Sequence, residues 1–298
     1  MNRSYVVGFV DKIPQALVSR MWGWLARRKH PKVCVHLLKS VFVKATGINM
    51  QEAADPAIGA YPCLEDLFVR TLKQGARRIE PDPTALVSPV DGRVGAAGTI
   101  EDGTMFQVKG RSYKLSDLLY DEAEAKRYEG GPYVTLYLSP KDYHLIHAPA
   151  SGVVAEASLI PGALMPVFPE ALERVDALFA RNERLITYLD SADAGRLAVV
   201  KVGATLVGRI SVPYDPDLQT NRKGQNQQIY KYDPAHLIQK GAHLGSFELG
   251  STVVLVGEKG RVTLEGLTEG AAVRMGQRIG TIQERKARKP GRSGASAG

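Results

Sequence analysis

The chain is poor in cysteine and tryptophan and lacks any long apolar run. Cys34 and Cys63 are the only cysteines among its 298 residues. They are too few for a disulfide framework, so a reducing compartment is expected. No stretch approaches the roughly eighteen apolar residues of a membrane-spanning helix, so none is predicted. The two tryptophans, Trp22 and Trp24, both lie near the N-terminus.

Acidic residues are scarce in the first fifty positions. This segment holds nine Lys and Arg residues and one acid, Asp11, which gives it a charge of +8. The rest of the chain holds 30 basic and 30 acidic residues, with a second basic cluster at 285–292. A neutral body without a recognised nucleic-acid-binding fold or aromatic platform argues against nucleic-acid binding. Basic ends suit attachment to an anionic membrane surface.

Apolar periodicity predicts two helices in this basic segment. After Pro14, apolar side chains recur at helical spacing as far as Leu25, and a second stripe runs from Pro31 to Gly47. Both stripes place Trp, Phe or aliphatic side chains against Lys and Arg, which is typical of interfacial amphipathic helices. Two ordinary surface helices packed on a core would give the same pattern. We interpret residues 1–50 as a membrane-associating helical arm.

From about residue 85 the pattern predicts a mainly β body. Short apolar runs alternate with Gly, Pro, Asp and Ser, and the clearest are Tyr133–Leu138, Leu185–Leu189, Leu197–Val202, Thr205–Val212, Thr252–Val256 and Val262–Leu264. Helices are expected at Leu115–Ala125 and Glu170–Phe179, a long polar loop at Pro213–Ile238 and a disordered basic tail at 286–298. The expected class is α+β: a mainly β core of barrel or sandwich type, at 51–285, behind an N-terminal amphipathic helical arm.

The bond between Gly250 and Ser251 is the most informative chemical feature. It stands just before the apolar run Val253–Val256, where a polar pair is unusual. Gly250 has no side chain to hinder approach to its carbonyl, and the Ser251 hydroxyl could attack that carbonyl to form an ester. Elimination and hydrolysis would leave a pyruvoyl group in place of Ser251. A plain turn before a strand is the ordinary alternative.

Two histidines and one aspartate are candidates for activating Ser251. His144 and His147 stand three residues apart just after a predicted strand, and Asp91 lies in a Val-Asp-Gly turn. In an Asp–His–Ser relay, the carboxylate orients the imidazole and the imidazole takes the serine proton. A structural histidine and a turn aspartate are the alternatives. No metal is expected, because no third ligand is grouped with the histidines.

Taken together, these segments resemble the bacterial phosphatidylserine decarboxylase proenzymes. The resemblance covers about residues 5–283, whereas the polar loop 214–238 follows the family pattern poorly and the basic tail falls outside it. The matching stretches are Phe68-Val69-Arg70, Ser88-Pro89-Val90-Asp91-Gly92, Tyr137-Leu138-Ser139-Pro140, Asp142-Tyr143-His144, His147-Ala148-Pro149, Phe179-Ala180-Arg181-Asn182-Glu183-Arg184, Val202-Gly203-Ala204-Thr205, Lys240-Gly241, Leu249-Gly250-Ser251-Thr252, Gly276-Gln277 and Ile279-Gly280.

The resemblance implies that the chain is a zymogen that cleaves itself between Gly250 and Ser251. The products would be a β subunit of residues 1–250 and an α subunit of residues 251–298. Ser251 would become the pyruvoyl cofactor at the new N-terminus. The two cleaved subunits would remain partners of one another.

By motif position, Asp91, His147 and Ser251 would form the self-cleavage triad. His144 would serve the decarboxylation step, in proton handling or carboxylate positioning. The implied reaction converts phosphatidylserine to phosphatidylethanolamine and CO₂, a carbon–carbon lyase activity of phospholipid biosynthesis. The enzyme would be peripheral on the cytoplasmic face of the inner or cell membrane, where its anionic substrate lies. Members of the family can form dimers, so a homodimer is a further expected assembly.

Two alternatives remain open from the residues alone. A soluble pyruvoyl-dependent amino-acid decarboxylase would share the serine chemistry but would have no use for the basic helical arm. A non-enzymatic, membrane-peripheral β scaffold would use the arm but would never be cleaved.

Overall fold

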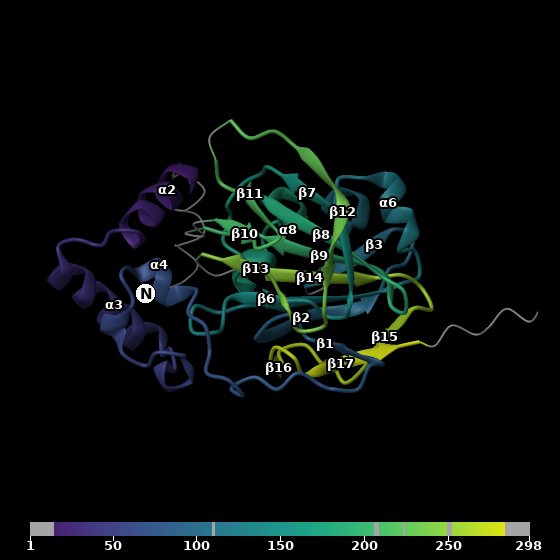
Figure 1. Cartoon of the computed structure of the whole chain (residues 1–298). Coiled ribbons are helices and arrows are strands. Elements are labelled where there is room, and N and C mark those ends of the chain that lie inside the picture. The colour runs from purple at the N-terminus through teal and green to yellow at the C-terminus, as the bar shows by residue number, and fades with distance from the viewer. Residues whose placement is uncertain (1–14, 109–110, 206–208, 223, 249–251, 284–298) are drawn as a thin grey trace, which may run out of the picture.

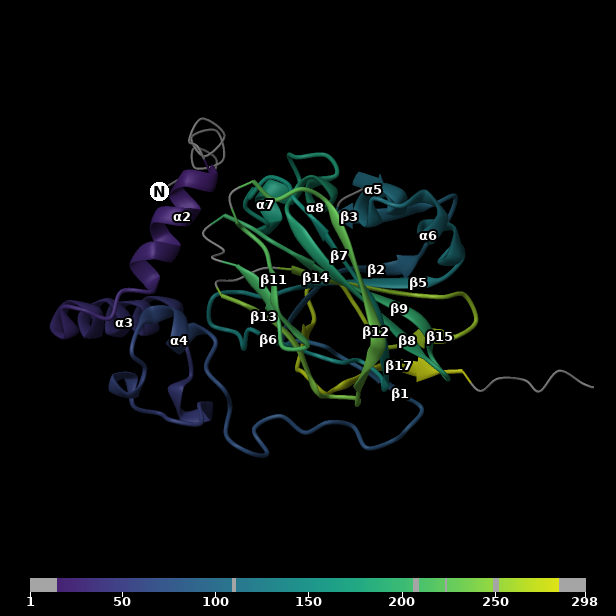
Figure 2. The same cartoon turned by 45° about the horizontal axis from the view of Figure 1, so that its top comes forward.

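The computed structural model describes residues 15–108, 111–205, 209–222, 224–248 and 252–283. The helices of the N-terminal segment lie to one side of a body built mostly of β-strands (Figures 1 and 2). This arrangement confirms the expected class, a mainly β core with an N-terminal helical arm.

An eight-stranded antiparallel sheet forms the centre of the body. Its strands, in spatial order, are β12 (Gln228–Ile238), β7 (Gly152–Ile160), β8 (Arg184–Ser191), β9 (Gly195–Val202), β14 (Thr252–Gly257), β5 (Pro132–Tyr137), β2 (Gly92–Thr99) and β16 (Ala272–Val273). Alternate side chains of β14 enter opposite cores: Val253 and Leu255 enter one, and Val254 and Val256 the other. Because both faces of this strand are covered, its sequence is a continuous apolar run.

The first core is closed by smaller sheets. A four-stranded sheet contains β11 (Asp215–Gln219), β10 (Ile210–Val212), β13 (His243–Phe247) and β6 (Leu145–His147). A three-stranded sheet contains β1 (Ala85–Val87), β17 (Arg278–Ile282) and β15 (Val262–Leu264). Ile146, Phe247 and Ile279 of these sheets share one buried cluster with Val199 of the large sheet.

The second core lies on the other face of the large sheet. Its covering elements are the hairpin β3 (Thr104–Val108) and β4 (Arg111–Lys114) and the short helices α5 (Leu115–Leu119), α6 (Glu122–Arg127), α7 (Pro169–Leu172) and α8 (Leu178–Arg181). Leu118 and Phe179 pack here with Ile186 and Val200 of the sheet. The helices expected at 115–125 and 170–179 are thus each two short ones, and Tyr120 in a left-handed conformation separates the first pair.

The prediction of a long loop at 213–238 is wrong. Strand β11 and the eleven-residue strand β12 occupy most of it, and β12 pairs with β7 as an edge of the large sheet. No β12 side chain is fully buried, and Ile229 and Leu237 are exposed beside the half-buried Tyr230 and Ile238, so apolar and polar residues do not alternate cleanly along the strand. The strand predicted at 205–212 begins only at Ile210 in the described residues.

The N-terminal helices share a small core of their own. The elements are α2 (Gln15–Ala26), α3 (Lys32–Thr46), the 3₁₀ turns η1 (Met50–Glu52) and η2 (Ile58–Ala60), and α4 (Leu64–Phe68). Ala26, Leu64 and Phe68 are buried together, with Trp22 and Phe42 packed against them. Within the described part of the chain, no helix has the length and apolar character needed to cross a bilayer. The domain boundaries at residues 50 and 285 stay predictions, and the tail 286–298 lies outside the described residues.

Candidate functional site

Sheet register brings three sequence segments to one end of the large sheet. Tyr137, the last residue of β5, lies opposite both Thr252, the first of β14, and Arg93, the second of β2. Asp91 directly precedes β2, the histidine segment follows β5, and Ser251 directly precedes β14. Strand pairing therefore gathers Asp91 and Thr252, which stand 161 positions apart in sequence, at one end of the sheet.

Gly92 allows β2 to approach β5 closely. A Cβ atom on this residue would lie 2.4 Å from the carbonyl oxygen of Tyr137. No larger residue fits without separating the strands, so Gly92 fixes the position of the neighbouring Asp91.

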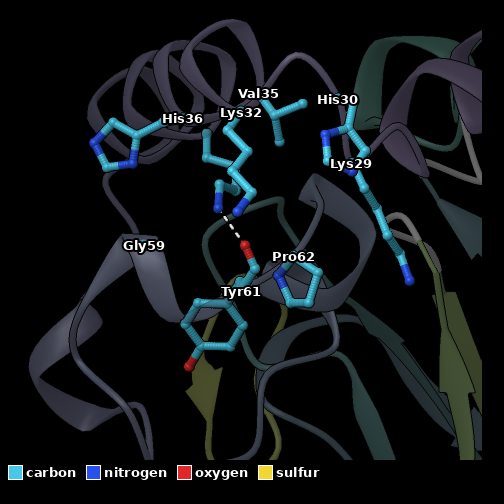
Figure 3. A pocket seen from close by; sticks show the side chains of 9 residues that line it. Lys29, His30, Lys32, Val35, His36, Gly59, Tyr61 and Pro62 are labelled. Atoms are coloured by element: carbon cyan, nitrogen blue, oxygen red, sulfur yellow. Dashed lines mark hydrogen bonds between the residues drawn. The ribbon is translucent and has the colours of Figure 1, made fainter.

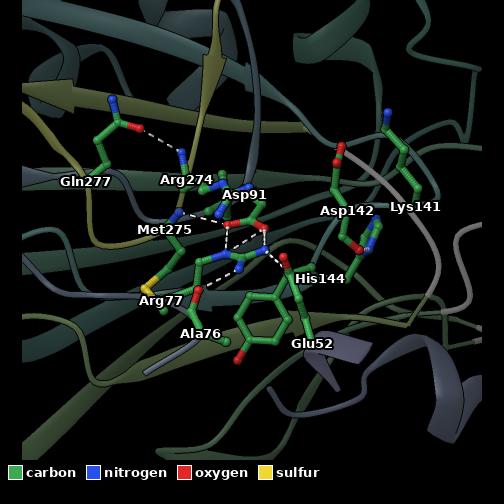
Figure 4. A network of polar contacts seen from close by, with 12 residues as sticks. Glu52, Ala76, Arg77, Asp91, Lys141, Asp142, His144, Arg274, Met275 and Gln277 are labelled. Atoms are coloured by element: carbon green, nitrogen blue, oxygen red, sulfur yellow. Dashed lines mark hydrogen bonds and ion pairs between the residues drawn. The ribbon is translucent and has the colours of Figure 1, made fainter. Parts of the chain in front are cut away.

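Asp91 is held by an arginine that the sequence did not single out. The Nε of Arg77 donates to both carboxylate oxygens, at 2.8 and 3.0 Å, and its Nη2 also bonds Oδ2. The main-chain N–H of Met275 donates to Oδ1 at 2.8 Å, and Glu52 pairs with the same guanidinium at 2.8 Å (Figure 4). The hydrogen bonds to Asp91 hold the pKa of Arg77 above its ordinary value.

His147 is oriented by a main-chain carbonyl. Its Nδ1–H donates to the carbonyl oxygen of Gly241 at 2.8 Å, so Nε2 is the lone-pair nitrogen of the neutral ring. That Nε2 accepts the phenolic O–H of Tyr143 at 3.1 Å. Burial lowers the pKa of His147 and raises the pKa of Tyr143 to about 12, so both groups are neutral at physiological pH.

Gly241 is confined to glycine by its conformation and surroundings. Its φ of +78° lies in the left-handed region, and an added Cβ would lie 2.2 Å from Cδ1 of Ile79. The motif Lys240-Gly241 thus has a structural reason, because it presents the carbonyl that fixes the tautomer of His147.

His144 lies in a fully buried position. Its Nδ1–H donates to the carbonyl oxygen of Asp142 at 2.8 Å, and its ring lies 4.0 Å from that of Phe68. Burial lowers the pKa of His144 to about 3, unlike the near-neutral value expected of a proton-transferring histidine. Its Nε2 is a buried lone pair without a hydrogen-bond partner in the described structure.

The structure places the predicted residues close in the fold but does not join them all. No hydrogen bond connects Asp91 with His147 among the described residues, although the Asp91 charge acts on the pKa of both His147 and Tyr143. Gly250 and Ser251 lie outside the described residues. Their neighbour Thr252 is buried, and its hydroxyl has no partner in the described structure.

Three functional groups escaped the sequence reasoning: the Arg77 guanidinium, the Tyr143 hydroxyl and the Gly241 carbonyl. Tyr143 and Gly241 stand in stretches that match the family pattern, so the sequence could have indicated them. Arg77 stands in no such stretch. Across the described residues, no cluster of three or more His, Cys, Asp and Glu side chains could hold a metal ion.

Comparison with known proteins gives a consistent result. Residues 64–281 match the sequence profile of the family described as phosphatidylserine decarboxylase. A phosphatidylserine decarboxylase proenzyme of Myxococcus xanthus is 41% identical over 283 residues, covering 95% of this chain and all of the relative. Proteins of the same name from Anaeromyxobacter sp. strain K and Brevibacillus brevis are 40% and 39% identical, each covering 94% of this chain and 99% of their own length.

Proposed function

Because the chain belongs to the phosphatidylserine decarboxylase family, a family of carbon–carbon lyases, we propose that it converts phosphatidylserine to phosphatidylethanolamine and CO₂. The observation that carries the proposal is the meeting of Asp91, the histidine segment and the start of β14 at one end of the large sheet. Strand pairing alone gathers these three segments there.

Self-cleavage is the first step of the proposal. The Ser251 hydroxyl attacks the Gly250 carbonyl, the peptide C–N bond breaks, and an ester with a free Ser251 amine forms. Loss of the Ser251 Cα proton and of the ester carboxylate releases residues 1–250 and leaves dehydroalanine at position 251, which water hydrolyses to the ketone with release of ammonia. A base must remove the hydroxyl proton, and the neutral His147 offers Nε2 for that purpose. Tyr143 occupies this nitrogen in the described structure, so its hydroxyl gives way when Ser251 engages the ring.

The pyruvoyl group is the cofactor we propose for the matured enzyme, made from Ser251. When formed, it would act as an electron sink for the charge left by CO₂ loss. Buried polar atoms without partners in the adjoining segments, Thr252 Oγ1 and His144 Nε2, fit a reacting group at this position.

The tautomer of His144 narrows its proposed role. Since Nδ1 carries the proton bonded to the Asp142 carbonyl, Nε2 presents a lone pair. A lone pair repels a carboxylate, so this tautomer disfavours carboxylate positioning. Proton handling by His144 would require its pKa to rise from about 3 when a reacting group contacts Nε2.

We place the enzyme peripherally on an anionic membrane, at the cytoplasmic face of the inner or cell membrane. Large apolar side chains of α2 and α3 are exposed to solvent: Met21, Trp24, Leu25, Val33, Leu37 and Val41. Beside them a cleft of about 370 Å³ is lined by Lys29, Lys32 and Lys39, together with His30 and His36, and has no acidic residue in its lining (Figure 3). Exposed apolar groups next to positive charge are what an anionic bilayer surface attracts.

Intact-mass measurement of purified protein tests the proposed maturation. We expect two fragments separated after Gly250, the smaller without an ordinary amino terminus. Ser251→Ala should remain a single chain without activity. Recovery of only uncut chain from a preparation that decarboxylates phosphatidylserine would refute the proposed cofactor.

An assay with liposomes separates the lipid reaction from the alternatives. Phosphatidylserine vesicles should release CO₂, and free serine should release far less. Equal rates on both substrates would favour a soluble amino-acid decarboxylase, and no release from either would favour a scaffold.

A further inference from the structure

A second cleft opens beside Asp91, between the N-terminal segment and the β body. It encloses about 330 Å³, within the range of roughly 300–1,000 Å³ typical of small-molecule sites. Its walls come from residues 47–52, 70–77, 91–93, 141–143 and 272–274.

Positive charge dominates this cleft. Five cationic side chains and three carboxylates line it, which gives a net charge of +2: Arg70, Arg77, Arg93, Lys141 and Arg274 against Glu52, Asp91 and Asp142. The carboxylates are already engaged. Arg77 holds both Asp91 and Glu52, while Asp142 accepts hydrogen bonds from the N–H and hydroxyl of Ser139 at 2.7 Å each.

Arg70 is the most buried of these cations and has no carboxylate partner among the described residues. Only 4% of its surface is exposed, and its Nη atoms donate to three main-chain carbonyls, those of Phe68, Lys141 and Asp142. Its Nε–H is buried without any partner. A buried, unpaired guanidinium is costly, and burial accordingly lowers the pKa of Arg70.

Two more cations at this cleft have no bonding partner for their charged groups among the described residues. Within the described part of the chain, the Lys141 ammonium and the Arg274 guanidinium form neither an ion pair nor a hydrogen bond. The two side chains lie on opposite sides of Asp91 in the view of Figure 4. An anion entering between them would also meet the buried edge of Arg70.

We propose that this cleft is a phosphate-binding site in which Arg70, Lys141 and Arg274 hold the anion. A phosphate group offers several acceptor oxygens and one to two negative charges, which suits three donors converging from separate segments. The phosphate could belong to the headgroup of an anionic phospholipid or to a free phosphate ion. The site needs no step of decarboxylation, so it stands or falls separately from the proposed reaction.

Titration calorimetry on the full chain at low salt tests this site. The probes are inorganic phosphate and monomeric dihexanoyl phosphatidylglycerol, with dihexanoylglycerol as the phosphate-free control. We expect the wild type to bind at least one phosphate-bearing probe, and the Lys141→Gln/Arg274→Gln variant to bind it at least tenfold more weakly. Lys126→Gln, an exposed cation on α6, should bind like the wild type.

Which of the two phosphate-bearing probes binds shows whether the phosphate belongs to a lipid headgroup or is free in solution. Binding of both probes with similar affinity indicates a free-phosphate site, and binding of the lipid alone indicates a headgroup site. The proposal is overturned if neither phosphate-bearing probe binds the wild type, or if the double variant binds as tightly as the wild type.

Discussion

The Arg77 guanidinium holds both carboxylate oxygens of Asp91, whereas no hydrogen bond joins Asp91 to His147, the histidine expected to be its partner, among the described residues. His147 instead donates its Nδ1–H to the Gly241 carbonyl. A carbonyl fixes the tautomer as well as a carboxylate would, but it supplies no full negative charge to stabilise an imidazolium. In this arrangement Asp91 acts on His147 through its field alone.

Replacing Arg77 by alanine should impair both folding and maturation. Asp91 would keep its burial but lose its counter-charge, and breaking a buried pair costs about 3–5 kcal/mol. We expect lower stability in urea and at least tenfold slower self-cleavage, followed by gel electrophoresis. Arg78→Ala, a change at the exposed neighbouring arginine, is the control and should match the wild type. Normal cleavage by the Arg77 variant would remove Arg77 from the site.

Local motifs predict several residues of this site. They do not predict which of these residues contact one another, because the contacts depend on long-range packing. Asp91, His144 and His147 stand beside turns and strand ends, and such positions are visible in sequence. Whether Asp91 pairs with a histidine or an arginine depends on the path of the connection between α4 and β1, which carries Arg77. That path is set by long-range packing, and periodicity does not report it.

Strand β12 shows the same limit. Its apolar side chains stand at exposed as well as half-buried positions, which removes the alternation on which strand prediction depends, yet its main chain pairs with β7 along most of its length. Strand β14 could be predicted, because both of its faces are covered and its sequence is therefore a continuous apolar run.

The Tyr143 hydroxyl should restrain self-cleavage. It donates to Nε2 of His147, the nitrogen that must accept the Ser251 proton. Tyr143→Phe removes a hydrogen bond worth about 1 kcal/mol, so we expect maturation up to about fivefold faster than in the wild type. The measurement is the fraction cleaved against time, with the exposed Tyr120→Phe as control. Maturation no faster than in the wild type would show instead that Tyr143 does not restrain the base.

Acid should destabilise the fold through His144. Its folded pKa of about 3 lies below the ordinary 6.5, so the unfolded chain binds more protons between these values. Stability is therefore lost as pH falls from about 6.5 toward 3. His144→Leu should lose less stability than the wild type over this interval in urea titrations, while the exposed His36→Leu should behave as the wild type. Parallel pH profiles for His144→Leu and the wild type would contradict the assignment.

Lys201 should destabilise the protein at neutral pH. It is fully buried between the sheets on β9, and its ammonium donates to the Thr187 hydroxyl. Thr187 in turn bonds the hydroxyl of Tyr214 at 2.6 Å, and no carboxylate is joined to this chain of groups among the described residues. Burial lowers the pKa of Lys201 from 10.5 to about 7.

The sign of the effect follows from proton binding. Between pH 7 and 10.5 the unfolded chain holds a proton that the folded chain has lost, so stability rises with pH across this window. Below pH 7 the full penalty applies. Lys201→Met removes the amine, and at pH 7 we expect a gain on the order of 2–5 kcal/mol that shrinks as the pH approaches 10. Urea unfolding at several pH values measures it, with the exposed Lys126→Met as control. A gain independent of pH would mean that Lys201 acts through packing, and a loss at pH 7 would show that its hydrogen bond to Thr187 outweighs the cost of burying the amine.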